Sequence, residues 1–145
     1  MLNLARGILP ATFAELRRCG AGGRECVVYW VGPIDRSGAV ERVVHPPHDA
    51  GPEYYNVDAA WVTSFFLHLR STRDTTRAQV HTHPGNSVRH SPADDRFALA
   101  PSIGFVSLVL PHFAMGSVTL EGSYAALVEP DGWTEKPPTE VIRWD

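Results

Sequence analysis

The stretch from Val80 to Asp95, V-H-T-H-P-G-N-S-V-R-H-S-P-A-D-D, constrains the structure of this chain more than any other part of it. Side chains alternate along an extended strand, so His81 and His83 point to the same face and both imidazoles can reach one ion. The Pro-Gly pair that follows stops the strand. Ten residues then separate His83 from Asp94, which lies just inside a predicted short helix and can supply an oxygen ligand.

These donors are typical of a catalytic zinc site. Two nitrogens and one oxygen at about 2.0 to 2.2 Å fill three tetrahedral positions and leave the fourth for water, whose pKa the metal lowers to about 7. Ser91, three residues before Asp94, is the predicted N-cap of the short helix and would lie beside the metal. The alternative is that His81 and His83 are ordinary strand-end histidines, but the full combination of residues favours a metal site.

The residues His81-Thr-His83-Pro84 and Ser91-Pro-Ala-Asp94 resemble the signature of the JAMM (MPN+, JAB domain) zinc metalloproteases. The resemblance implies an α+β MPN fold, with a curved mixed sheet and deaminase-like layering. It also implies one zinc ion with an activated water, held by His81, His83 and Asp94, and a Ser91 hydroxyl that stabilises the oxyanion.

The family also has a distant glutamate, for which the resemblance selects Glu25 in G-R-E-C-V-V-Y-W-V as the general base. The segment departs from the usual family pattern at the residue after Glu and at the following Gly. Glu41 on the next predicted strand is the competitor. Glu25 lies at the mouth of an apolar strand, where a carboxylate is costly without a partner, whereas Glu41 is expected to be solvated.

The resemblance implies cleavage after the C-terminal glycine of a ubiquitin-like protein, for deconjugation or precursor maturation. Small bacterial members of the family accompany E1-like and E2-like proteins in conjugation systems tied to phage defence. Two alternatives stay open: a peptidase that trims a sulfur-carrier protein, and a non-catalytic MPN scaffold. The residues themselves do not identify the amide that is cut.

Length and composition predict one domain over residues 1–145, because a chain of this size can bury one core. With 43% hydrophobic and 20% charged residues and no long apolar run, we expect neither disorder nor a membrane span. No signal peptide is recognised at the N-terminus, so a cytoplasmic location is expected.

A net charge of −3 with scattered arginines argues against nucleic acid as the main partner.

The cysteines and the remaining histidines suggest no second site. Cys19 and Cys26 match neither a redox pair nor a zinc knuckle, so both are expected to be reduced core thiols. His45 and His48 in H-P-P-H lack a third donor and are expected to be surface residues.

Hydrophobic periodicity predicts two helices, Pro10 to Cys19 and a longer one capped by Asp58. A further short helix is expected directly after Asp94. Strands are predicted over the ranges Glu25 to Pro33, Ala39 to His45, Ala78 to His83, Phe105 to Leu110, Gly116 to Leu120 and Ser123 to Glu129. The last two are expected to form a hairpin, and the tail is expected to pack or pair.

The predicted arrangement places the long helix on one side of the sheet and the metal loop at one edge. The range Pro46 to Val57, predicted as a loop, corresponds to the first of two family insertions that clamp the substrate; the second is nearly absent. Tyr54 and Tyr55, both expected to be exposed, are candidates for gripping a substrate tail, and the alternative is that they are packing residues.

Overall fold

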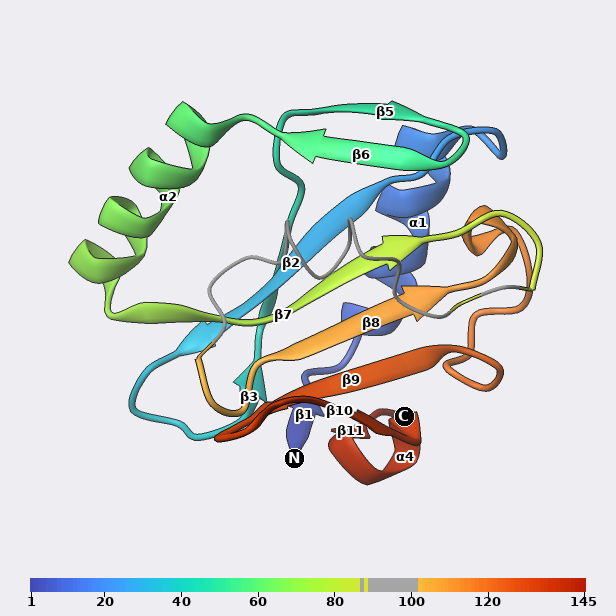
Figure 1. The fold of residues 1–145 in the computed structure, drawn as a ribbon. Helices are drawn as coiled ribbons and strands as arrows, with labels where there is room; N and C mark the ends of the chain where they lie inside the picture. The colour runs from blue at the N-terminus through green and yellow to red at the C-terminus, as the bar shows by residue number, and fades with distance from the viewer. Residues whose placement is uncertain (87, 89–101) are drawn as a thin grey trace.

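The computed structural model describes residues 1–86, 88 and 102–145 (Figure 1). Its helices are α1 (Ile8–Gly20), α2 (Ala59–Thr72), α4 (Pro138–Val141) and the 3-10 turn η1 (His112–Ala114). Its strands are β1 (Leu2–Leu4), β2 (Val27–Pro33), β3 (Ala39–Val40), β4 (Arg42–Val44), β5 (His48–Gly51), β6 (Tyr54–Val57), β7 (Asp74–Thr82), β8 (Val106–Leu110), β9 (Tyr124–Glu129), β10 (Gly132–Lys136) and β11 (Ile142–Arg143).

The main sheet has six strands in the order β10-β9-β8-β7-β2-β4. Only β7 and β8 pair in parallel; the other neighbours are antiparallel, so the sheet is mixed as predicted. The strand that carries His81 is therefore central. Most of the metal loop lies outside the described residues, so its expected place at one edge of the sheet stays a prediction. A second sheet, β11-β1-β3, joins the two ends of the chain, which lie close together in Figure 1.

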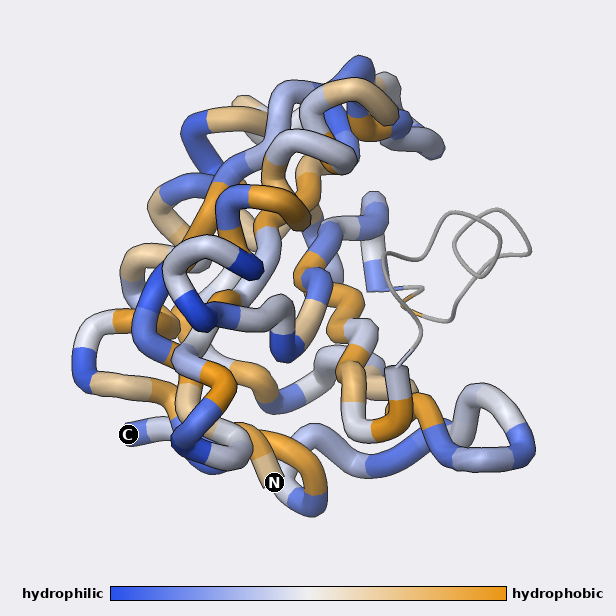
Figure 2. Tube along the Cα trace, turned by 90° about the vertical axis from the view of Figure 1, so that its left-hand side faces the viewer, coloured by the Kyte–Doolittle hydropathy of each residue, from blue (hydrophilic) through white to orange (hydrophobic). Residues whose placement is uncertain are grey.

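Alternation along β2 divides the core into two layers. Val28 and Trp30 pack with α1 on one face, while Val27, Tyr29 and Val31 pack with α2 on the other. Hydrophobic stretches run through much of the interior of the trace, with hydrophilic stretches at many outer turns (Figure 2). Helices thus cover both faces of the sheet, which gives the layered α+β architecture expected from the sequence.

Both long helices follow their sequence signals. Phe13 and Leu16, which are spaced to lie on one side of α1, are both buried. The Asp58 carboxylate accepts a hydrogen bond from the Trp61 backbone N–H at 2.9 Å and caps α2 as predicted. No helix among the described ranges combines the length and apolar character needed to cross a bilayer.

Two predicted strands are split or absent in the structure, and a third, predicted from Ala78 to His83, begins earlier, at Asp74. The range Ala39 to His45 is split at Glu41, because β3 pairs with β1 whereas β4 pairs with β2. The range Gly116 to Leu120 is not a strand, because its backbone bonds locally, as in the Thr119 N–H donating to the Ser117 carbonyl. The predicted second hairpin is therefore wrong, and β9 instead pairs with β10 from the tail.

The range Pro46 to Val57 is also wrong as a loop, because it contains the hairpin of β5 and β6. Its turn runs from Gly51 to Tyr54 with Pro52 at the second position, where the fixed φ of proline suits a turn. The hairpin lies above the end of the main sheet in Figure 1. The predicted helix after Asp94 lies outside the described residues.

Candidate metal centre

The end of β7 and the residue after it carry the two histidines of the sequence motif. His81 is fully buried and His83 is 9% exposed. The His83 N–H donates to the Leu110 carbonyl of β8 at 3.0 Å, and the His83 carbonyl accepts from the Phe113 N–H at 3.0 Å. The His83 backbone, directly after the strand, is thus bonded on both sides.

The two imidazoles are arranged as a pair of ligands to one ion would be. Their Nε2 atoms are 3.3 Å apart. Two nitrogens bound at 2.0 to 2.1 Å to a tetrahedral zinc ion are separated by about 3.3 to 3.4 Å. The spacing and the donor type therefore fit a metal, although ligation by His81 and His83 stays a prediction.

Glu25 comes to the same place from the neighbouring strand. Val27 pairs with His81 in the antiparallel β2–β7 ladder, and the Thr82 N–H donates to the Cys26 carbonyl at 3.1 Å. Continuing this register places Glu25 across from His83. Because directly opposite residues share a face of the sheet, Glu25, His81 and His83 belong to one face.

The burial of the two candidate glutamates differs. Glu25 is 4% exposed, and its N–H donates to the Gly51 carbonyl of β5 at 2.8 Å. Glu41 lies near the opposite end of β2, where its N–H donates to the Val31 carbonyl, and its carboxylate pairs with Arg36 at 2.5 Å. The geometry favours Glu25 over Glu41 as the group that acts with the histidines.

Other predicted site residues have mixed outcomes. Ser91 and Asp94 lie outside the described residues, so their roles stay predictions. Tyr54 is 57% exposed as expected, but Tyr55 is only 7% exposed because its ring packs 5.1 Å from the ring of His81.

The prediction of two reduced cysteines is wrong, because Cys19 and Cys26 form a disulfide. Cys19 lies near the end of α1 and Cys26 just before β2, and the turn between them brings their Cα atoms to 6.1 Å, within the range that a disulfide can bridge.

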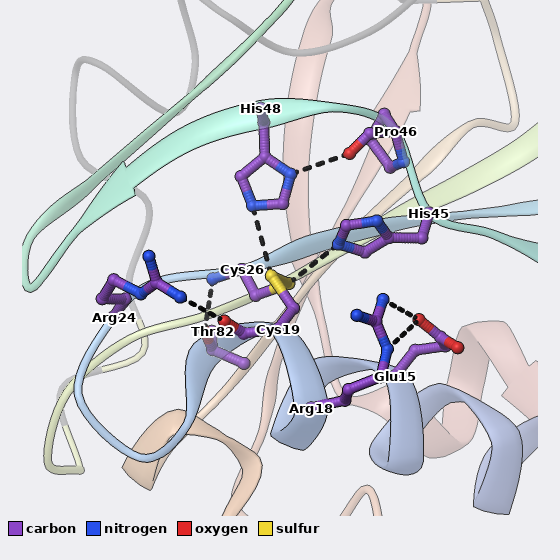
Figure 3. The surroundings of a disulfide bond; sticks show 9 residues. All are labelled: Glu15, Arg18, Cys19, Arg24, Cys26, His45, Pro46, His48 and Thr82. Carbon is purple, nitrogen blue, oxygen red and sulfur yellow. Dashed lines mark hydrogen bonds and ion pairs between the residues drawn. A yellow bond between two sulfur atoms is a disulfide. The ribbon is translucent and has the colours of Figure 1, made fainter.

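The prediction that His45 and His48 lack further donors is also wrong. Each Nε2 atom faces one sulfur of the disulfide, at 3.4 Å for His48 and Cys19 and at 3.5 Å for His45 and Cys26 (Figure 3). Burial, with a smaller contribution from His48, lowers the pKa of His45. The four residues are scattered over the sequence, so spacing alone gave little signal of the cluster.

Comparison with known proteins identifies the family of this chain. Residues 11–128 match the family described as prokaryotic homologs of the JAB domain. The chain is 32% identical over 118 residues to the probable metalloprotease y4jG of Sinorhizobium fredii. This match covers 77% of this chain and 71% of that protein.

Solved structures show the same fold at low sequence identity. A protein of Desulfitobacterium hafniense is similar over 100% of this chain and 93% of its own, with a TM-score of 0.70 and 21% identity. A JAB1/MPN domain protein of Archaeoglobus fulgidus is similar over 92% of this chain and 94% of its own, with a TM-score of 0.53 and 14% identity. From its sequence match and its fold, this chain belongs to the prokaryotic JAB-domain family.

Proposed function

We propose that this protein is a zinc-dependent isopeptidase or peptidase that cleaves after the C-terminal glycine of a ubiquitin-like protein. Family membership and the metalloprotease relative support the coarser assignment, a metal-dependent peptidase. The observation that carries the proposal is the buried pair of imidazoles 3.3 Å apart on the same sheet face as a buried glutamate.

His81 and His83 would hold the metal, and Asp94 is proposed from the sequence as the third ligand. When bound there, zinc supplies Lewis acidity and hydroxide at neutral pH. The two imidazoles must be neutral to act as ligands. Ser91 is proposed to donate a hydrogen bond from its hydroxyl to the oxyanion that forms on the substrate carbonyl.

Glu25 would act as general base and then as general acid. It takes a proton from the attacking water and later passes this proton to the leaving amine. The amine therefore leaves as a neutral group when the amide bond breaks. The Glu25 N–H is bonded to β5, and the carbonyl of the next residue, Cys26, is bonded to β7, so the Glu25 backbone lies between these two strands.

The β5–β6 hairpin suits an extended substrate tail. It adjoins the candidate site, since Gly51 contacts the Glu25 backbone and Tyr55 packs against His81. Within the described ranges, β6 pairs only with β5, so its other edge can bond to an added strand. A tail that ends in glycine could pass such an edge in extended form, with the exposed Tyr54 beside it.

The biological setting is proposed from the family resemblance alone. E1-like and E2-like proteins are the proposed partners, in a cytoplasmic bacterial conjugation system that acts against phage. A sulfur-carrier protein with a C-terminal extension would require the same chemistry at the same residues, so the two substrates must be separated by experiment.

The test is cleavage of two fusions, in which a ubiquitin-like protein or a sulfur-carrier protein is joined through its C-terminal glycine to a reporter. Bound metal is quantified on the same samples. We expect Glu25→Gln to lower the cleavage rate by about 10²- to 10⁴-fold while metal is retained, since it removes a general base without removing a ligand. Glu41→Gln is the matched control and should be unchanged, because Glu41 is remote from the histidines.

Preference for one fusion identifies the substrate class. Faster cleavage of the sulfur-carrier fusion would replace the ubiquitin-like assignment. Absence of bound metal and of cleavage in the wild-type protein would contradict the enzymatic proposal and favour a binding scaffold.

A further inference from the structure

Four potential metal ligands meet on the α1 side of the sheet, outside the candidate site described above. We call Cys19, Cys26, His45 and His48 the Cys–His cluster. They come from the end of α1, the residue before β2, the segment after β4 and the start of β5 (Figure 3). Their ligand atoms, two Sγ and two imidazole nitrogens, all lie within 4.8 Å of one another.

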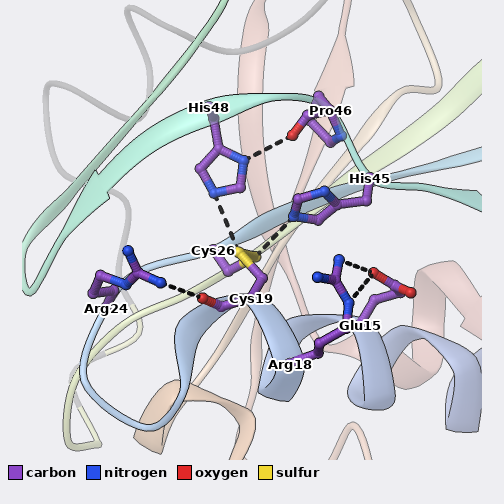
Figure 4. Close-up of polar contacts among 8 residues, drawn as sticks. All are labelled: Glu15, Arg18, Cys19, Arg24, Cys26, His45, Pro46 and His48. Atoms are coloured by element: carbon purple, nitrogen blue, oxygen red, sulfur yellow. Dashed lines mark hydrogen bonds and ion pairs between the residues drawn. A yellow bond between two sulfur atoms is a disulfide. The ribbon is translucent and has the colours of Figure 1, made fainter.

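The hydrogen bonding of His48 orients its ring toward sulfur. Its Nδ1 lies 2.9 Å from the Pro46 carbonyl oxygen, which can only accept, so Nδ1 carries the proton (Figure 4). In the neutral ring this leaves the lone pair of Nε2 facing Cys19 Sγ at 3.4 Å. A disulfide sulfur offers no proton to that lone pair. A metal ion would fill this position, and a backbone carbonyl bonded to Nδ1 is the usual support of a histidine ligand.

The distances in the Cys–His cluster are close to those of a tetrahedral zinc site. Bonds of about 2.3 Å to sulfur and 2.0 to 2.1 Å to nitrogen separate a sulfur and a nitrogen ligand by about 3.5 to 3.6 Å. The two sulfur–nitrogen contacts are 3.4 and 3.5 Å. The two sulfurs, no longer bonded to each other after reduction, would lie about 3.8 Å apart when both bind one tetrahedral ion.

We propose that, after reduction of the disulfide, Cys19, Cys26, His45 and His48 bind one zinc ion as a closed structural site. A dithiol reductant transfers two electrons and two protons to the disulfide, which gives two thiols and leaves the reductant as a disulfide. Zinc then binds as both thiols lose their protons, so two protons are released. Two thiolates and two imidazoles in a tetrahedral set are typical ligands of zinc.

The surroundings of the cluster are compatible with a bound cation. A surface cavity of about 260 Å³ is lined by Arg18, Cys19, Arg24, His45, His48 and Ala50, and gives an entry path. Arg18 is paired with Glu15 at 2.7 Å, which offsets its charge. Cys19 lies in the last turn of α1, where the helix dipole favours positive charge.

Four protein ligands would leave no open position, so the cluster would be structural rather than catalytic. It joins α1 and the β5–β6 hairpin to Cys26, the neighbour of Glu25. The Cys26 N–H also donates to Thr82 Oγ1 at 2.9 Å. A metal here would therefore fix the strand ends that carry Glu25 and His81, without touching substrate.

The test uses the full chain, purified with and without a thiol reductant and loaded with cobalt in place of zinc. We expect the reduced protein to show the thiolate-to-cobalt charge-transfer absorption, and the oxidised protein to lack it. Cys19→Ser and His48→Gln should each weaken or abolish this absorption and lower bound zinc by one equivalent. His68→Gln, at an exposed position of α2, is the matched control and should change neither.

Cobalt bound by the reduced wild-type protein without thiolate absorption would overturn the proposal, as would absorption that persists when both cysteines are replaced by serine. The wild-type comparison needs no variant to fold. The result is also independent of the proposed function, because imidazole and carboxylate ligands at the other site give no thiolate absorption.

Discussion

The His81–His83 pair and the Cys–His cluster lie on either side of the same peptide, Glu25–Cys26, yet they are built differently. The pair comes from the end of β7 and the residue directly after it, where continued alternation puts both imidazoles on one face. The cluster is assembled from four segments, and its geometry depends on how α1, β2, β4 and β5 meet. The pair is proposed as part of an open ligand set, which serves chemistry, and the cluster as a closed set, which serves structure. Because the proposed ligands of the two regions are different residues, each region can be changed without the other.

The largest expected effect is that of removing a ligand from the pair. We expect His83→Ala to lose the metal of that site and to lower amide cleavage by at least about 10³-fold, since metal-supplied hydroxide is lost with it. The thiolate-to-cobalt absorption of the Cys–His cluster should be retained, which shows in the same sample that the variant is folded. Loss of both metal signals would contradict the independence of the two regions.

A smaller effect is expected where the two regions share a hydrogen bond. Thr82→Val removes the oxygen that accepts from the Cys26 N–H at 2.9 Å, at a fully buried position. A buried donor left without a partner costs about 1 to 3 kcal/mol, so we expect the free energy of unfolding in urea to fall by that amount. Thr63→Val, at an exposed position of α2, is the matched control.

The same variant sharpens the comparison of the two regions. If the Cys26–Thr82 contact couples them, Thr82→Val should weaken metal binding by the Cys–His cluster and slow amide cleavage together. A change in stability with unchanged metal affinity and cleavage would show that each region is held by its own contacts.

The difference between the two regions also explains what the sequence could predict. The His81–His83 pair, the Asp58 cap of α2 and the buried strand β2 follow from local rules of alternation, capping and apolar runs, and the structure contains all three. The disulfide between Cys19 and Cys26 and its two histidine neighbours depend on tertiary contacts, which spacing in a single sequence does not encode. Only Pro52, at the second position of a turn, was a local signal for the missed β5–β6 hairpin.

The smallest effect is expected at a site remote from both regions. The Asp58 carboxylate accepts the Trp61 N–H and satisfies one of the free donors at the start of α2. Removal of such a cap costs about 1 kcal/mol, so Asp58→Ala should lower the midpoint of thermal unfolding slightly, with Asp145→Ala at the exposed C-terminus as control. Metal content in both regions should stay the same, because α2 packs on the sheet through Phe65 and Leu69, which contribute no ligand. A drop in metal content in this variant would mean that α2 helps to hold the strand ends, and that the two regions depend on the same wider packing.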